Sequence, residues 1–280
     1  MDKEAFTSAE IEAIWNDLGK IYVDLPEKKC SINSISQFIN ILNQFNGKND
    51  IAFLELACGS GILAEYIIKN HIDRFKKLTF FDISDFMIEQ TTKRMKFAID
   101  NPKLVIKKEN CEYLDYIEKD SLDMVMGNLL IHLVENPNNL MKCASKYLKS
   151  QGYLFLSILQ PLEACTFMKL VKDLIPRYSN QKSNKRSYFY FAEDKLMDKL
   201  AKEYDFTIVE RSKVDIDYKE NEEQLLNLYK DFLKFEKYPE KIGSDNFDNL
   251  IKDVHQEIKR YEKENKMIGI GIENFVLKKN

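Results

Sequence analysis

An apolar run that ends in a glycine-containing turn constrains the fold of this chain more than any other segment. The run is "IAFLEL" (residues 51–56), and it is followed directly by "ACGSG" (57–61) and the helix-forming "ILAEYIIKN" (62–70). An apolar stretch of this length is typical of a strand buried on both faces. Two glycines in the turn indicate that the backbone bends sharply or lies bare against something else. The segment therefore predicts a strand, a tight turn and a helix.

Strand and helix patterns alternate along the first half of the chain. Two amphipathic helices are expected first, over 11–21 and 34–45. After the glycine turn, strands are expected over 77–82, 103–109, 121–128 and 153–159, with helices over 87–98 and 137–149. Such alternation predicts an α/β fold in which a mostly parallel sheet carries helices on both faces.

The second half of the chain shows a looser pattern. We expect helices over 162–175 and 192–204, a strand over 206–218, helices at about 222–235 and 246–264, and a last strand over 267–278. Residues 1–280 are treated as a single domain. Its expected parts are an N-terminal helical lid (1–47), a cofactor-binding core (48–160) and a C-terminal half (161–280) with a helical cap at about 219–265.

Composition excludes several classes of function. The formal net charge of −3 argues against general nucleic-acid binding, which normally needs a basic surplus. No stretch of roughly 18 apolar residues is present and the first residues lack a targeting pattern, so we expect a cytoplasmic protein without membrane contact. Five scattered cysteines and three separated histidines predict neither a disulfide framework nor a metal site. We expect a monomer or a weak homodimer.

The glycine turn is compatible with two kinds of nucleotide ligand. Parallel sheets bind nucleotides at the carboxyl ends of their strands, where this turn lies. One candidate is a dinucleotide, because Gly59, Gly61 and Ala64 satisfy the pattern G-x-G-x-x-G/A and Asp82 follows about 20 residues later. A nicotinamide-dependent oxidoreductase is therefore one alternative.

The second candidate follows from a resemblance to a known family. "ELACGSG" (55–61), "FFDISDFM" (80–87) and the segment 121–159 resemble motifs of class I S-adenosylmethionine-dependent methyltransferases. The resemblance spans about residues 50–160, and the order of elements extends it to the C-terminus. It implies a Rossmann-like sheet of seven strands with an antiparallel last strand, S-adenosylmethionine as cofactor, and methyl transfer by in-line displacement.

Glu55 favours the methyl donor over the dinucleotide. A carboxylate at this position would repel a pyrophosphate, whereas it suits the positively charged amino group of a methionine moiety. In one respect the chain departs from the family, which often has glycine where this sequence has Ala57.

The resemblance also implies roles for individual residues. Backbone at Gly59 and Gly61 would lie against the cofactor, Asp82 would accept both ribose hydroxyls, and Asn128 and Leu129 would face the reactive end. The full expected cofactor set is Tyr22, Glu55, Ala57, Cys58, Gly59, Gly61, Asp82, Ile83, Met87, Cys111, Glu112, Asn128 and Leu129.

Several of these residues have a purely structural alternative. Asp82 would also suit the N-terminus of the following helix, Ile83 and Met87 would suit a hydrophobic core, and Cys111–Glu112 depart from the family's usual adenine contact. His132 is a candidate catalytic residue that would orient or deprotonate an acceptor. A histidine bonded within its own loop is the alternative for this position.

The helices between the sixth and seventh strands bear on the acceptor. They resemble the caps over small-molecule acceptors in the trans-aconitate and biotin-pathway carboxyl methyltransferases, and the layout also resembles histamine N-methyltransferase. The aromatic residues Tyr178 and 188–191 are expected to line an apolar pocket. We therefore expect a small-molecule amine or carboxylate as acceptor. A protein or tRNA methyltransferase and a non-catalytic scaffold remain as alternatives.

Overall fold

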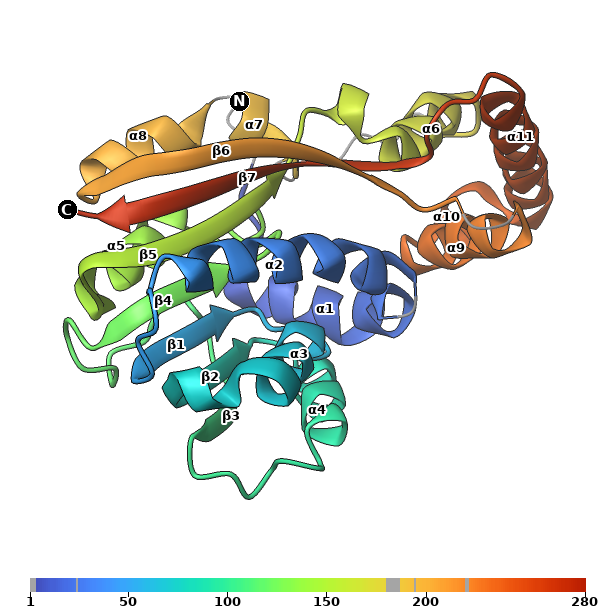
Figure 1. The fold of residues 1–280 in the computed structure, drawn as a ribbon. Coiled ribbons are helices and arrows are strands. Elements are labelled where there is room, and N and C mark those ends of the chain that lie inside the picture. Colours follow the sequence, from blue (N-terminus) through green and yellow to red (C-terminus); the bar gives the residue numbers. More distant parts are fainter. Residues whose placement is uncertain (1–3, 24, 180–186, 194, 220–221) are drawn as a thin grey trace.

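A seven-stranded sheet forms the centre of the molecule (Figure 1). The computed structural model describes residues 4–23, 25–179, 187–193, 195–219 and 222–280. The strand order is β3-β2-β1-β4-β5-β7-β6. The strands are β1 (Ile51–Leu56), β2 (Phe75–Asp82), β3 (Leu104–Lys108), β4 (Leu122–Gly127), β5 (Leu148–Leu159), β6 (Phe206–Asp217) and β7 (Gly269–Lys279).

The sheet has the topology that the sequence predicts. The pairs β1–β2, β1–β4, β2–β3 and β4–β5 are parallel. The last strand, β7, is antiparallel to both β5 and β6, between which it lies. The Rossmann-like fold with an antiparallel last strand is thereby confirmed. The strand order reverses at β1 and β4, and the carboxyl ends of these two strands are where such sheets hold their ligands.

Alternation of side chains along the strands builds a hydrophobic core on each face of the sheet. Phe53 of β1 packs with α2 (Leu25–Asn43) and α3 (Ile62–His71) on one face. Leu54 and Leu56 pack with α5 (Pro137–Tyr147) and α8 (Leu196–Glu203) on the other. Because both faces are covered, β1 is buried along its whole length, as its continuous apolar sequence predicts.

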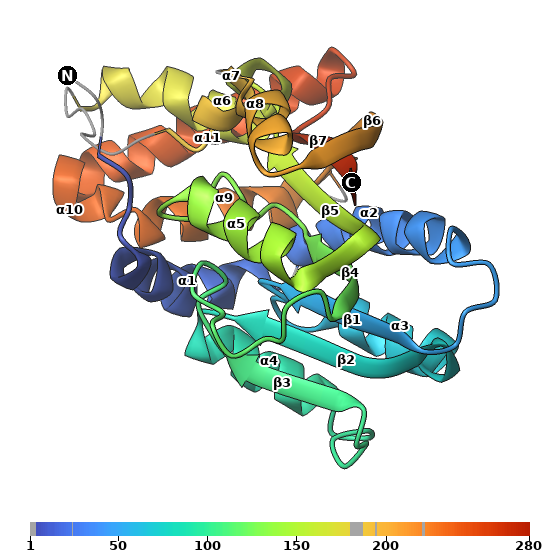
Figure 2. The same cartoon turned by 90° about the vertical axis from the view of Figure 1, so that its left-hand side faces the viewer.

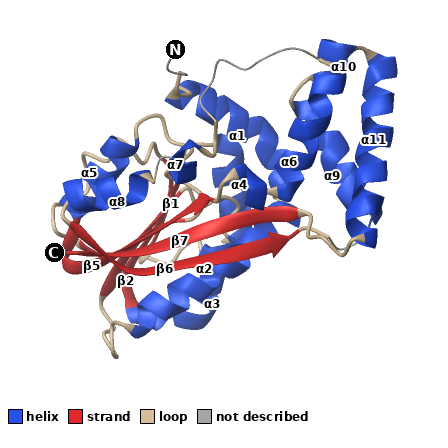
Figure 3. Cartoon of the chain, turned by 90° about the horizontal axis from the view of Figure 1, so that it is seen from above, coloured by secondary structure: helices blue, strands red, loops and turns tan. Residues whose placement is uncertain are grey.

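A third core lies beyond the ends of β5, β6 and β7. There α6 (Thr166–Leu174), α9 (Glu222–Phe235) and α11 (Ser244–Lys263) pack on one another and on the strand ends. The short helices α7 (Tyr190–Glu193) and α10 (Tyr238–Ile242) complete this half. Figure 3 shows α6, α9 and α11 together at one end of the long strands β6 and β7.

The first helix links the two halves of the molecule. Helix α1 (Ser8–Tyr22) lies against α4 (Asp85–Arg94) on one side and α9 on the other (Figure 2). Its N-terminus carries a capping box formed by Thr7 and Glu10. No helix in the described part of the chain has the length and apolar character needed to cross a membrane.

Some element boundaries differ from those expected. Helix α2 begins at Leu25 rather than at Ser34, because Pro26 and Glu27 are both suited to a first helical turn. Strand β5 begins at Leu148, which pairs with Leu122 of β4, so the helix before it ends earlier than expected. The expected helix over 162–175 is a shorter α6 flanked by single 3₁₀ turns.

Gly61 has a structural role at the start of α3. It is the N-cap residue with a φ of +79°, a conformation that glycine adopts without steric cost. A Cβ at this position would lie only 2.8 Å from Cγ2 of Thr91 on α4. The absence of a side chain therefore lets α3 and α4 approach each other.

We expect Gly61→Ala to destabilise the protein more than Gly47→Ala does. Gly47 has the same φ of +79° but open space around it, so its substitution adds only the left-handed backbone cost of about 1–2 kcal/mol. Gly61→Ala adds a steric clash with Thr91, which costs roughly a further 1 kcal/mol or more. Urea denaturation of both variants measures the difference. Equal losses of stability would contradict the proposed contact.

Candidate active site

A cavity of about 260 Å³ opens at the carboxyl ends of β1, β2 and β4. Thirteen of the residues expected at the site line this cavity. They are Tyr22, Glu55, Ala57, Cys58, Gly59, Asp82, Ile83, Met87, Cys111, Glu112, Asn128, Leu129 and His132. Gly61 does not line it, so the expectation of a direct ligand contact by this glycine is not supported by its position.

The glycine turn is held in shape by bonds from outside it. The backbone N–H of Cys58 donates to the carbonyl of Phe81 (2.8 Å), and the Thr91 hydroxyl donates to the carbonyl of Gly59 (2.7 Å). Ala57 has a φ of +53°, in the left-handed region that favours glycine. The alanine is therefore accommodated in a strained conformation, which explains why glycine suits this position.

Asp82 is placed at the cavity by two backbone donors. Its Oδ2 accepts from the N–H of Gly59 (3.0 Å) and its Oδ1 from the N–H of Ser84 (2.9 Å). Each oxygen keeps a second lone pair for a ligand. Burial raises the pKa of Asp82 to about 6, although these donors act in the opposite direction.

Glu27 on α2 is a site residue that the sequence reasoning missed. Its Oε1 accepts from the N–H of Ser60 (2.6 Å), while its buried Oε2 has no hydrogen-bond partner. A Cβ on Gly59 would collide with this carboxylate. The sequence held little signal for it, since Glu27 is a single acid in a stretch that was not expected to be helical.

A second buried carboxylate, Glu55, lies at the end of β1. It is 4% exposed and its Oε2 also lacks a hydrogen-bond partner. Burial, and then the charges of Glu27 and Asp82, raise the pKa of Glu55 well above its ordinary value. Burial likewise raises the pKa of Glu27, and Arg94 and Lys28 oppose this effect.

The described lining of the cavity is strongly acidic. Among the described residues no lysine or arginine lines it, whereas six acids do, namely Glu27, Glu55, Asp82, Glu109, Glu112 and Glu236. A cationic ligand would relieve the repulsion among buried carboxylates, and an anionic ligand would add to it. The cavity therefore suits a ligand with positive charge.

Glu112 has a clear structural function at the wall of the cavity. Its two carboxylate oxygens accept from the backbone N–H groups of Glu135 (3.0 Å) and Asn136 (2.8 Å), which lead into α5. The neighbouring Cys111 is buried, and burial raises the pKa of its thiol well above the ordinary value. Both residues thus line the cavity, as expected, and Glu112 also anchors the loop before α5.

The loop after β4 presents Asn128, Leu129 and His132 to the cavity. Leu129 has a φ of +50°, and its N–H donates to the Ser157 hydroxyl (2.7 Å), which in turn donates to Oδ1 of Asn128 (2.8 Å). His132 is 3% exposed, and its buried Nδ1 has no hydrogen-bond partner. Burial lowers the pKa of His132 to about 3, so its ring is neutral.

Comparisons with known proteins agree with this geometry. Residues 54–154 match the family model described as "Methyltransferase domain". This match covers the glycine turn, Asp82 and the loop with His132. This part of the chain is a methyltransferase domain. Among curated protein sequences, none matches it.

Solved structures share the fold at low sequence identity. The cyclase SpnF is 10% identical with a TM-score of 0.58, over 100% of this chain and 99% of that one. The YjhP protein of E. coli is 13% identical with a TM-score of 0.52, over 88% of this chain and 92% of that one. Phosphoethanolamine N-methyltransferase 2 of Haemonchus contortus was solved with S-adenosylmethionine. It is 15% identical with a TM-score of 0.50, over 98% of this chain and 57% of that one.

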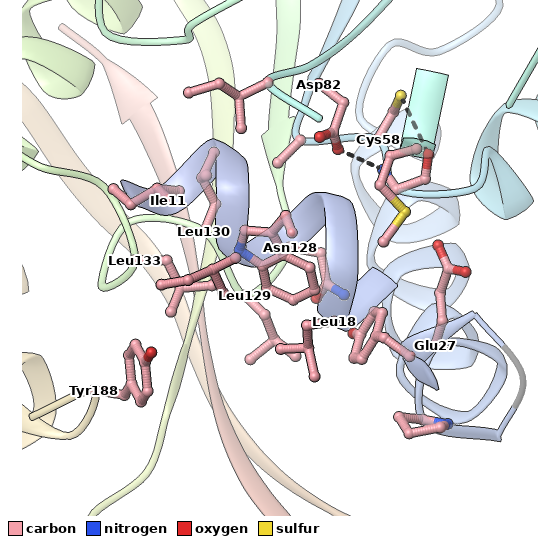
Figure 4. Close-up of a pocket in the computed structure, with 18 of the residues that line it drawn as sticks. Ile11, Leu18, Glu27, Cys58, Asp82, Asn128, Leu129, Leu130, Leu133 and Tyr188 are labelled. Atoms are coloured by element: carbon pink, nitrogen blue, oxygen red, sulfur yellow. Dashed lines mark hydrogen bonds between the residues drawn. The ribbon is translucent and has the colours of Figure 1, made fainter. Parts of the chain in front are cut away.

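Helix α1 forms one wall of the cavity. It contributes Ile11, Ile14, Trp15 and Leu18, and Figure 4 shows Ile11 and Leu18 on this helix, between Tyr188 on one side and Glu27 and Cys58 on the other. Polar contacts hold the helix in place. Asn16 accepts from the Ser84 hydroxyl (2.8 Å), Ser8 donates to Glu135 (2.8 Å), and Lys108 bridges Glu12 and Asp85 (2.6 Å each).

The same cavity extends to the C-terminal half of the chain. Leu228, Phe232 and Phe235 of α9 line it, together with Phe167 and Met168 of α6. Helix α11 packs behind α9 and contributes no lining residue in the described part. The expected cap therefore lines the cavity through α9 and through Glu236, which directly follows it.

The expected set of pocket aromatics needs correction. Tyr188 lines the cavity, but Phe189 and Phe191 are buried in two different cores. The Tyr178 hydroxyl instead donates to Asp253 of α11 (2.9 Å). Sequence clustering of aromatics did not distinguish residues that face a cavity from residues that build the core. Among the described residues, no group of three or more potential ligands is placed to hold a metal ion.

We expect the His132 ring to remain neutral from about pH 8 down to about pH 5, because its buried site cannot solvate the charged form. NMR titration of the imidazole signals measures this, with His132→Gln as the assignment control. A midpoint near the ordinary value of 6.5 would contradict the described environment.

A stability effect of defined sign follows from the same burial. The unfolded chain binds a proton at His132 below pH 6.5, whereas the folded protein does not until about pH 3. Acidification through this window therefore lowers the stability of the wild type relative to His132→Gln, by up to about 1.4 kcal/mol per pH unit.

Proposed function

We propose that the enzyme transfers a methyl group from S-adenosylmethionine to a small-molecule amine. One observation carries this proposal: a single cavity joins an acidic end at the glycine turn to an apolar end formed by α6 and α9, and α1 walls both. A cavity bounded in this way favours a small acceptor over an extended polymer. Of the two acceptor classes expected from the sequence, an amine suits the acidic lining, and a carboxylate would be repelled by it.

The residues present fit the cofactor. Asp82 has lone pairs available for two hydroxyl groups, and Gly59 leaves its backbone uncovered. The unpartnered oxygens of Glu27 and Glu55 suit an ammonium group, which would also satisfy their hydrogen-bonding capacity. S-adenosylmethionine supplies a methyl group on a positively charged sulfur. We assign the remaining expected residues, including Tyr22, Cys58, Ile83 and Met87, to the walls around it.

The chain itself contributes alignment and exclusion of water. The apolar face of α1 covers the cavity, which keeps an acceptor aligned and dry. Neutral His132 can accept a hydrogen bond from an acceptor N–H and thereby orient the nitrogen lone pair. We propose that His132 positions the acceptor. The transfer then requires no side chain that acts as a general base.

We also propose that the chain works as one unit. In this scheme residues 1–47 act as the lid, residues 48–160 bind the cofactor, and residues 161–280 bind the acceptor through the part that includes α9. Contacts of α1 with both α4 and α9 support this division, because one helix touches both functional halves.

The alternatives make different demands on the cavity. A nicotinamide dinucleotide would bring a pyrophosphate into a cavity whose described lining has three clustered carboxylates and no lysine or arginine. A protein or tRNA substrate would need an open surface in place of the α1 and α9 walls. A scaffold without activity would have no use for unpartnered buried carboxylates, which cost stability.

Calorimetry with S-adenosylmethionine, S-adenosylhomocysteine and NAD tests the proposal first. We expect saturable heat from the first two ligands and none from NAD. Transfer of a radiolabelled methyl group to a panel of small amines and matched carboxylates then tests the reaction, with amines expected to be labelled faster. Binding of NAD, or labelling of carboxylates alone, would overturn the assignment of cofactor or acceptor, respectively.

Glu55→Gln is expected to separate ligand binding from stability. Loss of the charge should weaken binding of S-adenosylhomocysteine roughly tenfold, about 1.4 kcal/mol, because its ammonium loses a carboxylate partner. The raised pKa of Glu55 means that the folded wild type retains a proton that the unfolded chain releases above pH 4.5. The wild type without ligand should therefore lose stability relative to Glu55→Gln as the pH rises.

Glu89→Gln is the matched control, since Glu89 lies on the surface of α4 in an ion pair with Lys93. We expect neither effect from it. Unchanged ligand affinity in Glu55→Gln would show that this carboxylate does not face the cofactor.

A further inference from the structure

The end of the cavity remote from the glycine turn contains one acidic side chain among aromatic ones. Tyr188 lies toward the Ile11 end of α1, whereas Glu27 and Cys58 lie toward its Leu18 end (Figure 4). Glu236, which directly follows α9, lines the same region with Phe232 and Phe235. Both side chains line the same cavity, and the charge of Glu236 acts on the Tyr188 hydroxyl.

Nothing in the described structure explains this carboxylate as part of the fold. No described side chain forms a hydrogen bond or ion pair with it, although burial raises the pKa of Glu236. Lys241 partly offsets that effect from a distance, and its own ammonium lies over the ring of Tyr238 (4.9 Å). Glu236 is half-buried, and an acid that is partly withdrawn from water without a partner destabilises the protein unless a ligand supplies the partner.

The aromatic neighbours of Glu236 suit one kind of partner. The Tyr188 ring is held by stacking on Phe6, with centroids 5.6 Å apart and planes within 5°. Burial, and then the charge of Glu236, raise the pKa of Tyr188 to about 12, so its hydroxyl is protonated. Aromatic faces beside a carboxylate attract an organic cation through both its charge and its apolar substituents.

We propose that Glu236 and Tyr188 form a subsite for a protonated amino group at the far end of the acceptor. The acceptor then has two functional ends. Its nucleophilic nitrogen lies near His132, its cationic group lies at Glu236, and an apolar body between them contacts Phe232 and Leu228. This inference rests on the proposed function, because only a methyl transfer at the other end of the cavity makes Glu236 the distal end.

Three probes that share a phenylbutyl group and differ in its terminal group test the subsite: phenylbutylamine, phenylbutanol and phenylpentanoate. Their binding is measured by calorimetry on the full chain saturated with S-adenosylhomocysteine. The wild type should bind the amine at least about tenfold more tightly than the alcohol, and should bind the carboxylate least. In Glu236→Gln the preference of amine over alcohol should fall to less than about twofold, with the affinity for the alcohol unchanged.

Glu240→Gln is the matched control, because Glu240 is an exposed acid on the adjacent helix α10. It should keep the preference of the wild type, whereas a general effect of net charge would change both variants alike. Equal changes in the two variants, or a full amine preference in Glu236→Gln, would overturn the subsite.

The outcome is separable from that of the proposed function. Absence of S-adenosylhomocysteine binding would contradict the proposed function before any probe is added. Normal S-adenosylhomocysteine binding with no discrimination among the three probes would contradict the subsite alone. Thermal denaturation of Glu236→Gln guards against misfolding, and a melting temperature at or above that of the wild type is expected because a half-buried charge has been removed.

Discussion

Repulsion among three buried carboxylates around one glycine turn is the constraint on which the rest of the site depends. Glu27, Glu55 and Asp82 come from three different elements, and burial raises the pKa of each. No lysine or arginine of the described chain lines the cavity beside them. Removing charge from water is costly unless a partner of opposite sign is present. A cationic nucleoside would be such a partner, so under the proposed function the feature that costs stability in the free protein would provide affinity for the methyl donor.

The turn itself is kept open by contacts made on its outer side. Thr91 bonds the carbonyl of Gly59, and Arg94 donates to the carbonyl of Ser60 (2.8 Å), so α4 holds the loop from behind. Glu27 contacts it from α2, which places an N-terminal helix at the cavity. Helix α2 is therefore connected to the glycine turn by a direct bond, from the Ser60 N–H to the Glu27 carboxylate. Movement of α2 and exposure of the turn should accompany each other.

Local sequence patterns predicted the fold well and the site in part. The continuous apolar run 51–56 is β1 to the residue, and the acids at Glu55 and Asp82 lie on the cavity, because strand ends fix where such residues go. Glu27 was missed because nothing local distinguishes an acid that reaches a distant loop from one in solvent. The aromatic segment 188–191 was overinterpreted, since three of its four residues do not line the cavity. Facing a cavity depends on neighbours that lie far apart in the chain.

The sequence by itself determined the α/β architecture, the glycine turn, the acid that ends β2 and, through its motifs, the resemblance to methyltransferases. These follow from periodicity, chain stiffness and short spacings, which are properties of neighbouring residues. Only the tertiary structure decided which charges meet. It brought Glu27 against Ser60, placed the carboxylates in a cavity that no described lysine or arginine lines, and set Glu236 and Tyr188 in the lining of the same cavity. Electrostatic energy depends on distance and burial, and both are defined only when the helices are packed on the sheet.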